Sequence, residues 1–140
     1  MEPNDALELT LSLSRLSGAI TRQIERPLSA HHGLSLGDLA LLLELQRAGG
    51  RLHRGDLAQH LGITASGVAR QLQPLERIGV VGRESHPTDA RLAIVVLTEV
   101  GDTLATDARR TAEEAAARTL DDRWTRTRQQ KLAELVAAGR

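Results

Sequence analysis

Cysteine is absent from this chain of 140 residues, and aromatic side chains are nearly absent, with Trp124 as the single one. The lack of cysteine excludes disulfides, thiolate metal ligands, cysteine nucleophiles and thiol-based redox sensing. A core without aromatic rings must be built from Leu, Val, Ile and Ala, which favours helices packed on helices. The same shortage argues against binding of single-stranded RNA, because that binding needs aromatic platforms for the bases.

Long apolar runs and an excess of charge of one sign are also missing. The sequence has no apolar run of 18 residues and no positively charged segment at its start, so we expect neither a membrane span nor a secretory signal. We therefore expect a cytoplasmic protein that forms one domain, residues 1–140. The 18 basic and 18 acidic residues give a formal net charge of zero, so any nucleic-acid binding must depend on positive charge placed locally.

Motifs of catalysis and metal binding are missing as well. The chain contains no Gly-rich phosphate loop, no His-Glu-x-x-His and no nucleophile elbow, so we expect no enzymatic activity and no cofactor. His31 and His32 are adjacent, and His53 and His60 lie at opposite ends of one short expected helix. Neither spacing makes a chelating pair, so no metal site is predicted.

The N-terminal segment has the apolar period of a helix. Leu9, Leu13, Leu16, Ile20 and Ile24 recur at spacings of four, three, four and four residues, which places them on one face. Pro27 and the run 30–33 are expected to end this helix of about 20 residues, which spans roughly 30 Å. One domain of this size rarely needs so long a helix for its own core, so the pattern indicates a partner.

The middle of the chain predicts three further helices. Ser35 can cap a helix over 36–47 that is apolar on most sides and is expected to be the buried central helix. A short helix over 54–61 ends at Gly62. Thr64 can cap a helix over 65–78, in which Pro74 is expected to bend or loosen the last turn before Gly79.

The apolar period then changes to that of strands. The pair 80–81 and the run 92–97 are β-branched and apolar, and they flank a polar stretch over 85–90, which predicts a hairpin with a long tip. Thr98 is expected to cap a long helix to about residue 118. Asp121 or Asp122 is expected to cap a final helix that carries Trp124 and an apolar set near the C-terminus.

The two helices around Gly62 have the pattern of a helix-turn-helix. Leu57, Leu61, Val68 and Leu72 can hold them at a fixed crossing, which leaves one face of the second helix free for the major groove of DNA. This pattern alone also fits an ordinary pair of packed helices. The hairpin directly after it favours a winged helix-turn-helix, so we predict a mainly α fold with a small β-wing.

Several motifs resemble those of the multiple-antibiotic-resistance regulator (MarR) family. They are Leu57-Ala58-x-x-Leu61-Gly62-Ile63, then Arg70 with Leu75-Glu76-x-x-Gly79-Val80-Val81, and above all Asp89-x-Arg91-x5-Leu97-Thr98-x-x-Gly101 across the wing. With the order of helices on both sides, the resemblance covers nearly the whole chain. It implies dimerisation helices over about 5–30 and 99–138, around a DNA-binding lobe over about 35–98.

The resemblance also implies partners. Family members are homodimers that bind a pseudo-palindromic operator in double-stranded DNA, and typical members are repressors that a small, often phenolic, ligand releases. Ligands in the family sit between the dimer helices and the winged lobe, which here implies the surroundings of His31 and Asp38. The shortage of aromatics leaves no obvious stacking wall for a phenolic ligand.

The expected DNA contacts lie on the second helix of the pair and on the wing. Arg70 is a base-edge or phosphate donor, Gln73 could read adenine, and a wing arginine is expected in the minor groove or on phosphate. Asp89 is expected to pair with a nearby Arg and to hold the wing tip. His53 is a further candidate for a phosphate contact, while Arg77 is expected only to balance charge. The predicted DNA-contacting set is Arg54, Ser66, Ala69, Arg70, Gln73, Arg83, His86 and Arg91.

The terminal helices would expose a large apolar patch on a monomer, which favours dimerisation. The predicted interface set is Leu9, Leu13, Leu16, Ile20, Trp124, Leu132, Leu135 and Val136. Packing of these helices on their own domain remains an alternative. For the function, two alternatives also remain open: a winged-helix adaptor that does not bind DNA and regulates by protein–protein contact, and a small enzyme or ligand carrier.

Overall fold

The computed structural model describes residues 1–89 and 92–140. Its elements follow in the order α1 (Pro3–His32), α2 (Leu36–Arg47), β1 (Arg51–His53), α3 (Arg54–Leu61), α4 (Ala65–Arg77), β2 (Val81–Ser85), β3 (Ala93–Leu97), α5 (Glu99–Asp121) and α6 (Arg126–Ala138). The prediction of a mainly helical chain with a small β hairpin is therefore confirmed.

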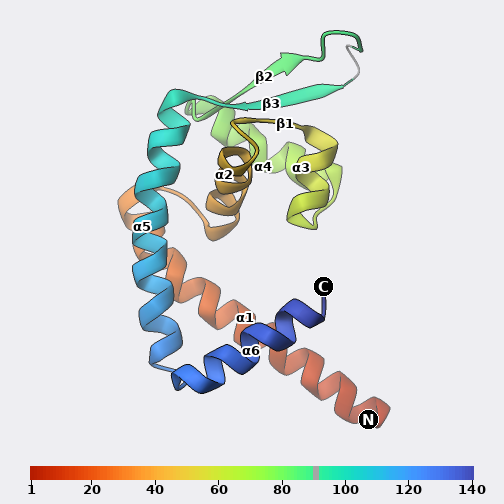
Figure 1. Ribbon diagram of the computed structural model, residues 1–140, viewed down its shortest axis with the longest axis vertical. Coiled ribbons are helices and arrows are strands. Elements are labelled where there is room, and N and C mark those ends of the chain that lie inside the picture. The colour runs from red at the N-terminus through yellow and green to blue at the C-terminus, as the bar shows by residue number, and fades with distance from the viewer. Residues whose placement is uncertain (90–91) are drawn as a thin grey trace.

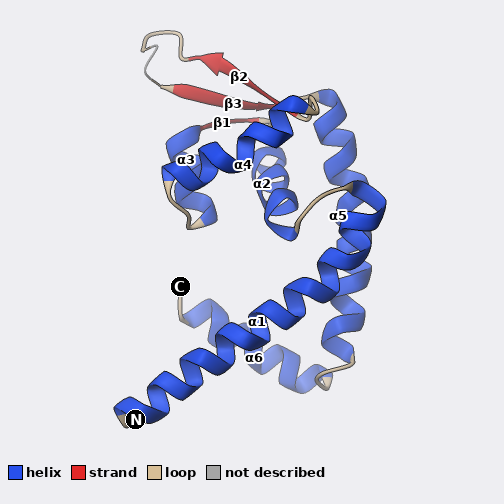
Figure 2. Ribbon diagram, turned by 180° about the vertical axis from the view of Figure 1, so that it is seen from behind, coloured by secondary structure: helices blue, strands red, loops and turns tan. Residues whose placement is uncertain are grey.

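The molecule is elongated, and α5 joins its two ends. Helices α2, α3 and α4 and the strands lie at one end, while α6 and the first half of α1 lie at the other (Figure 1). Seen from behind, the strands form a short layer beyond the helices, and the hairpin of β2 and β3 projects from it (Figure 2). In the described parts of the chain, no helix combines the length and apolar character needed to cross a membrane.

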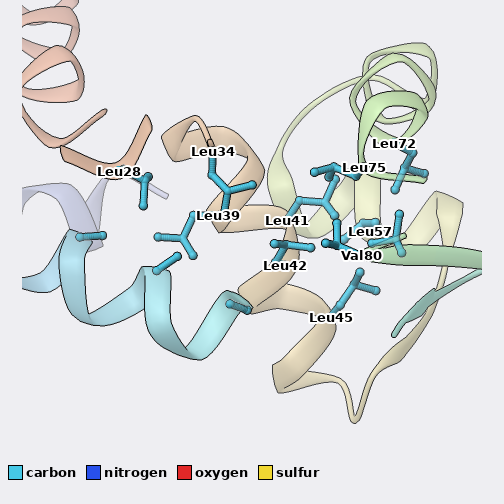
Figure 3. Close-up of a cluster of buried hydrophobic side chains, with 14 of the residues drawn as sticks. Leu28, Leu34, Leu39, Leu41, Leu42, Leu45, Leu57, Leu72, Leu75 and Val80 are labelled. Atoms are coloured by element: carbon cyan, nitrogen blue, oxygen red, sulfur yellow. The ribbon is translucent and has the colours of Figure 1, made fainter. Parts of the chain in front are cut away.

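Helix α2 is the centre of the core, as its apolar pattern predicts. Its side chains Leu41, Leu42 and Leu45 are fully buried. Figure 3 shows leucines of α3 and α4, together with Val80, turned toward these three. Ser35 caps α2 as expected, in a reciprocal pair of hydrogen bonds with Asp38.

The sheet contains a strand that the sequence pattern did not predict. Its order is β1-β3-β2, and both pairs are antiparallel, with Leu52 opposite Val95 and Arg83 opposite the same residue on the other side. Strand β1 is three residues long and follows Gly49 and Gly50, so it has too few residues to show an alternating pattern. This segment is a strand because its backbone pairs with the edge of β3.

Helix α1 is longer than predicted: Pro27 does not interrupt it, and it ends within the expected run 30–33. The helix has 30 residues and continues through Pro27 to His32, where Gly33 with φ of 68° closes it. Proline removes one backbone hydrogen bond. The packing of the last turns outweighs that loss, since Leu28, directly after the proline, is fully buried.

The expected start of the last helix is wrong. Helix α6 begins at Arg126 with Thr125 as its N-cap, so Trp124 lies before the helix and neither Asp121 nor Asp122 caps it. The backbone N–H of Trp124 instead donates to the carbonyl of Leu120 and extends the turn at the end of α5. Asp121 accepts a hydrogen bond from the Gln129 amide, which ties α6 to the end of α5.

Candidate nucleic-acid interface

The pair α3 and α4 meets at a tight turn whose geometry follows from its residues. Gly62 ends α3 with φ of 65°, a backbone conformation that glycine adopts without a steric penalty. Thr64 then caps α4, because its hydroxyl accepts the backbone N–H of Gly67 at 3.0 Å. The same hydroxyl lies 3.2 Å from that of Ser66, so Ser66 stands at the first turn of α4.

Helix α4 has one buried and one open side. Val68, Leu72 and Leu75 face the core and are buried, as predicted. Ser66, Arg70 and Gln73 are exposed on the open side, and Ala69 is half-buried between the two. The helix runs on past Pro74 to Arg77. The prediction of which face of this helix is buried is therefore confirmed, while contact of the open face with DNA stays a prediction.

The arginines around α4 differ in their ion pairs. Arg70 and Arg77 are exposed and Arg54 is half-buried at the start of α3, and none of the three has an acidic partner in the described parts of the chain. Arg83 of β2, in contrast, donates to Glu76 of α4 at 3.0 Å. Glu84, the next residue, pairs with Arg51 of β1.

The start of the wing tip is organised by His86. Its Nδ1 accepts the backbone N–H groups of Thr88 and Asp89, each at 3.2 Å. Its ring also lies edge-on to that of His53, with 6.0 Å between the centroids. His86 therefore shapes the turn in addition to any contact it makes with a partner. Asp89 is half-buried, whereas Arg91, the expected wing contact, lies outside the described residues.

A cleft of about 580 Å³ opens between α1, α2 and α5. Its wall is mostly apolar and includes Ile24, Leu36 and Leu39. Polar side chains also line it, and two of them, Arg109 and Glu113, form an ion pair at 2.6 Å. The resemblance implied a ligand site near His31 and Asp38, but neither residue lines this cleft. In the described parts of the chain no group of three or more His, Asp and Glu could hold a metal ion.

The far end of the molecule exposes apolar side chains on α1 and α6. The exposed fractions are 48% for Leu9, 52% for Leu13, 72% for Leu135 and 52% for Val136. Leu16, Ile20, Trp124 and Leu132 of the predicted interface set are half-buried. Ile20 packs against the core, while Trp124 and Leu132 line a second hollow beside α6. Much of this apolar surface is therefore uncovered in a single chain.

Sequence reasoning missed three features of this region. Arg51 was not considered, because its position beside the hairpin depends on the unexpected strand β1. Arg77 was expected to balance Glu76, but Glu76 pairs with Arg83 instead. The contact of Gln71 in α4 with Asp38 in α2 joins residues 33 positions apart and has no local signal. The spacing of three residues between Ser35 and Asp38 is a local signal for the cap of α2, but not for the contact with Gln71.

These features define the class of the protein: a winged helix-turn-helix with an open, amphipathic second helix and long terminal helices. The family model described as the MarR family matches residues 32–92. Over this segment the chain is similar to the MarR family, and the fold of the whole chain is the one seen in solved MarR family transcriptional regulators. A comparison with curated proteins gave no significant match.

Solved structures share the fold over nearly the full length. Sco3205, a MarR family transcriptional regulator from Streptomyces coelicolor solved in complex with DNA, is 24% identical with a TM-score of 0.86, over 99% of this chain and 87% of that one. AbsC, a MarR family regulator from the same organism, is 25% identical with a TM-score of 0.78, over 95% and 88%. An organohalide-sensing transcriptional regulator bound to 2,4-dichlorophenol is 18% identical with a TM-score of 0.86, over 99% and 79%.

Proposed function

We propose that this protein is a homodimeric, sequence-specific DNA-binding repressor of transcription that a small apolar ligand releases from its operator. The observation that carries the proposal is the open face of α4, where Arg70 stands exposed and without an acidic partner in the described residues, opposite the buried stripe of Val68, Leu72 and Leu75. A helix with this distribution can enter the major groove without disturbing its own packing.

On DNA, each side chain has a role suited to its chemistry. Arg70 donates to a guanine edge or a phosphate, Gln73 reads an adenine, and Ser66 bonds a phosphate near the start of α4. Arg54 contacts the backbone from the start of α3, as His53 can from beside it. On the wing, Arg83, His86 and Arg91 follow the adjacent backbone or minor groove, Asp89 holds the tip, and Ala69 permits close approach.

Two copies are needed to bind a pseudo-palindromic operator. The uncovered apolar side chains of α1 and α6 support a dimer through the terminal helices, because a stable monomer rarely leaves so large an apolar surface in water. Such a dimer would hold its two α4 helices about one DNA turn (~34 Å) apart.

The cleft between α1, α2 and α5 is the best-supported place for an effector. Its volume of about 580 Å³ lies within the usual range for small ligands, roughly 300–1,000 Å³. Its wall is mostly aliphatic, and the charged side chains Arg109 and Glu113 in it are paired with each other, which favours a small apolar compound over a charged one. The relative solved with 2,4-dichlorophenol supports this class of ligand.

Binding to the DNA upstream of its own gene, measured by fluorescence anisotropy at two salt concentrations, tests the proposal. A regulator binds one site tightly, and its affinity falls steeply with salt because phosphate contacts release counterions. An adaptor shows only weak binding without sequence preference, and an enzyme or carrier shows none. Transcription from the bound promoter in vitro then has to fall on adding the protein, and a rise would contradict the assignment as a repressor.

A further inference from the structure

Helix α4 is joined to the N-terminus of α2 by a side chain that the DNA-binding face does not use. Gln71, half-buried on the flank of α4, donates from Nε2 to Oδ1 of Asp38 at 3.4 Å. The other carboxylate oxygen of Asp38 accepts the backbone N–H of Ser35 at 3.1 Å. Asp38 therefore bonds the first turn of its own helix with one oxygen and the recognition helix with the other.

Helix α1 also contacts the first turn of α2. Oε1 of Glu25 accepts the backbone N–H of Leu36 at 2.9 Å, which satisfies one of the free donors at the start of α2. The side chains of Glu25, Ser35, Asp38 and Gln71, together with the backbone N–H groups of Ser35 and Leu36, thus form a polar connection from α1 through α2 to α4. We call this set the α2 junction.

Gly37 shows how closely the α2 junction is packed. A Cβ atom at this position would lie 3.3 Å from Nε2 of Gln71 and 3.7 Å from the Ser35 hydroxyl. A side chain here would push the Gln71 amide away from Asp38, and their bond is already near the upper limit of hydrogen-bond distance. Glycine therefore leaves the space through which Gln71 reaches α2.

The α2 junction also borders the apolar cleft. Leu36, whose N–H is bound by Glu25, lines the cleft together with Ile24, the residue before Glu25 in α1. A compound held between these two side chains contacts both of the helices that the bond between Glu25 and Leu36 joins. Any shift of α1 relative to the start of α2 acts directly on that bond.

The geometry points to the α2 junction as the device that transmits the position of α1 to the recognition helix α4, with Gln71 as a positioning residue and not a DNA contact. The inference has two parts. The first, that α1 and α4 are coupled, concerns the protein without DNA. The second, that this coupling controls operator binding, rests on the proposed function.

Hydrogen–deuterium exchange of the full-length protein without DNA tests the first part. In Gln71→Met and in Glu25→Ala, amides over 65–77 should exchange about fivefold faster than in the wild type, the equivalent of one lost hydrogen bond. Glu25→Gln keeps a carbonyl acceptor for Leu36 and should restore the wild-type rate. Gln59→Met, the same change on an exposed residue of α3, is the matched control. Unchanged exchange of α4 in Glu25→Ala would overturn the inference, because Glu25 bonds α2 and not α4.

The variant Gly37→Ala distinguishes an effect of Gln71 on the position of α4 from an effect on the stability of the protein. Alanine is the better helix former, so the thermal midpoint should not fall. The exchange of α4 should nevertheless rise, because the new methyl group displaces Gln71. A variant with slower or unchanged exchange in α4 would contradict the role of the Gln71 contact.

Operator binding tests the second part. Gln71→Met should weaken binding about fivefold with an unchanged dependence on salt, since no phosphate contact is lost. Glu25→Ala combined with Gln71→Met should weaken it no more than the stronger single variant, because both break one connection. A reduced salt dependence, or additive losses, would overturn the inference. If the wild type binds no DNA, the proposed function fails, whereas the exchange rates still decide whether the α2 junction couples α1 to α4.

Discussion

At the scale of single residues, we expect the proposed DNA binding to depend most on Arg70. It is exposed on α4, and no acidic group in the described residues competes for it. We expect Arg70→Ala to weaken operator binding by about 1–3 kcal/mol, roughly 5- to 150-fold, with the thermal midpoint unchanged. Anisotropy titrations of operator and scrambled DNA measure this. A base contact lowers the preference for the operator, whereas a phosphate contact lowers the salt slope by about one.

Arg110→Ala is the matched control for this prediction. Arg110 is exposed on α5 and forms an ion pair with Asp107 at 2.7 Å, away from the α4 face. Its loss should leave the affinity for both DNAs within about twofold, as expected for a surface pair worth ~0–1 kcal/mol. Equal affinities of Arg70→Ala and the wild type would show that the open face of α4 is not the contact face.

Glu76 limits the charge that the wing can offer to DNA, because it holds Arg83 in an ion pair. Glu76→Gln removes one negative charge near DNA and frees the arginine. We therefore expect tighter operator binding by a few fold and a steeper dependence of affinity on salt. Glu113→Gln, which removes the partner of Arg109 on α5, is the control and should change neither quantity. Weaker binding in Glu76→Gln would mean that the pair itself orients Arg83 for its contact.

At the scale of elements, the start of α5 packs against the segment between α4 and β2. Thr98 caps α5 through the Gly101 N–H at 3.0 Å and donates its hydroxyl proton to the carbonyl of Gly79 at 2.7 Å. Gly101 lies directly on the backbone of Val80, where a Cβ atom would come within 2.0 Å of the carbonyl oxygen. The helix that joins both ends of the molecule is thus packed against the lobe by backbone contact.

This contact predicts that Gly101→Ala is severely destabilising. The obstacle is backbone, which cannot rotate away as a side chain end can, so we expect a loss of about 3 kcal/mol or more. A thermal melt should show a midpoint lower by on the order of 10 °C. Gly55→Ala in α3 is the control, since a Cβ there meets nothing within 4 Å, and it should be neutral or stabilising. A wild-type midpoint in Gly101→Ala would contradict the close approach of α5 to Val80.

Elements also show which boundaries a sequence can predict. The starts of α2, α4 and α5 follow from Ser35, Thr64 and Thr98, because a cap acts on the next three residues and is a local property. The predicted start of α6 was wrong because the backbone of Trp124 is hydrogen-bonded to Leu120 and continues the turn at the end of α5. Strand β1 was missed because pairing with β3, and not its own three residues, makes it a strand.

At the scale of the whole molecule, the terminal helices leave apolar side chains in contact with water. We expect sedimentation at micromolar concentration to show a dimer. Replacing Leu13 and Leu135 together by Glu should produce monomers, because burying an unpaired carboxylate is unfavourable. The monomers should bind the operator at least tenfold more weakly, since only one α4 can be placed at a time. A monomeric wild type would contradict the dimer.

Arg15→Glu provides the matched control, as it adds a carboxylate to α1 on the side away from the stripe of Leu9, Leu13, Leu16 and Ile20. It should leave both the dimer and the operator affinity intact. Dissociation in this variant as well would indicate that the added charge weakens α1 in general, and would remove the argument for the stripe.

The sequence by itself determined the local features: the capped helices, the buried stripe of α4 with its open opposite face, and the wing motif that carries the family resemblance. These depend on residues within a few positions of each other, where helical and strand periods apply. The tertiary structure decided which arginines stay available, since Arg83 and Arg51 meet their acidic partners only when α4, β1 and β2 are brought together. It also decided the cleft beside Leu36 and the bond of Gln71 to Asp38, because both join helices that are distant along the chain.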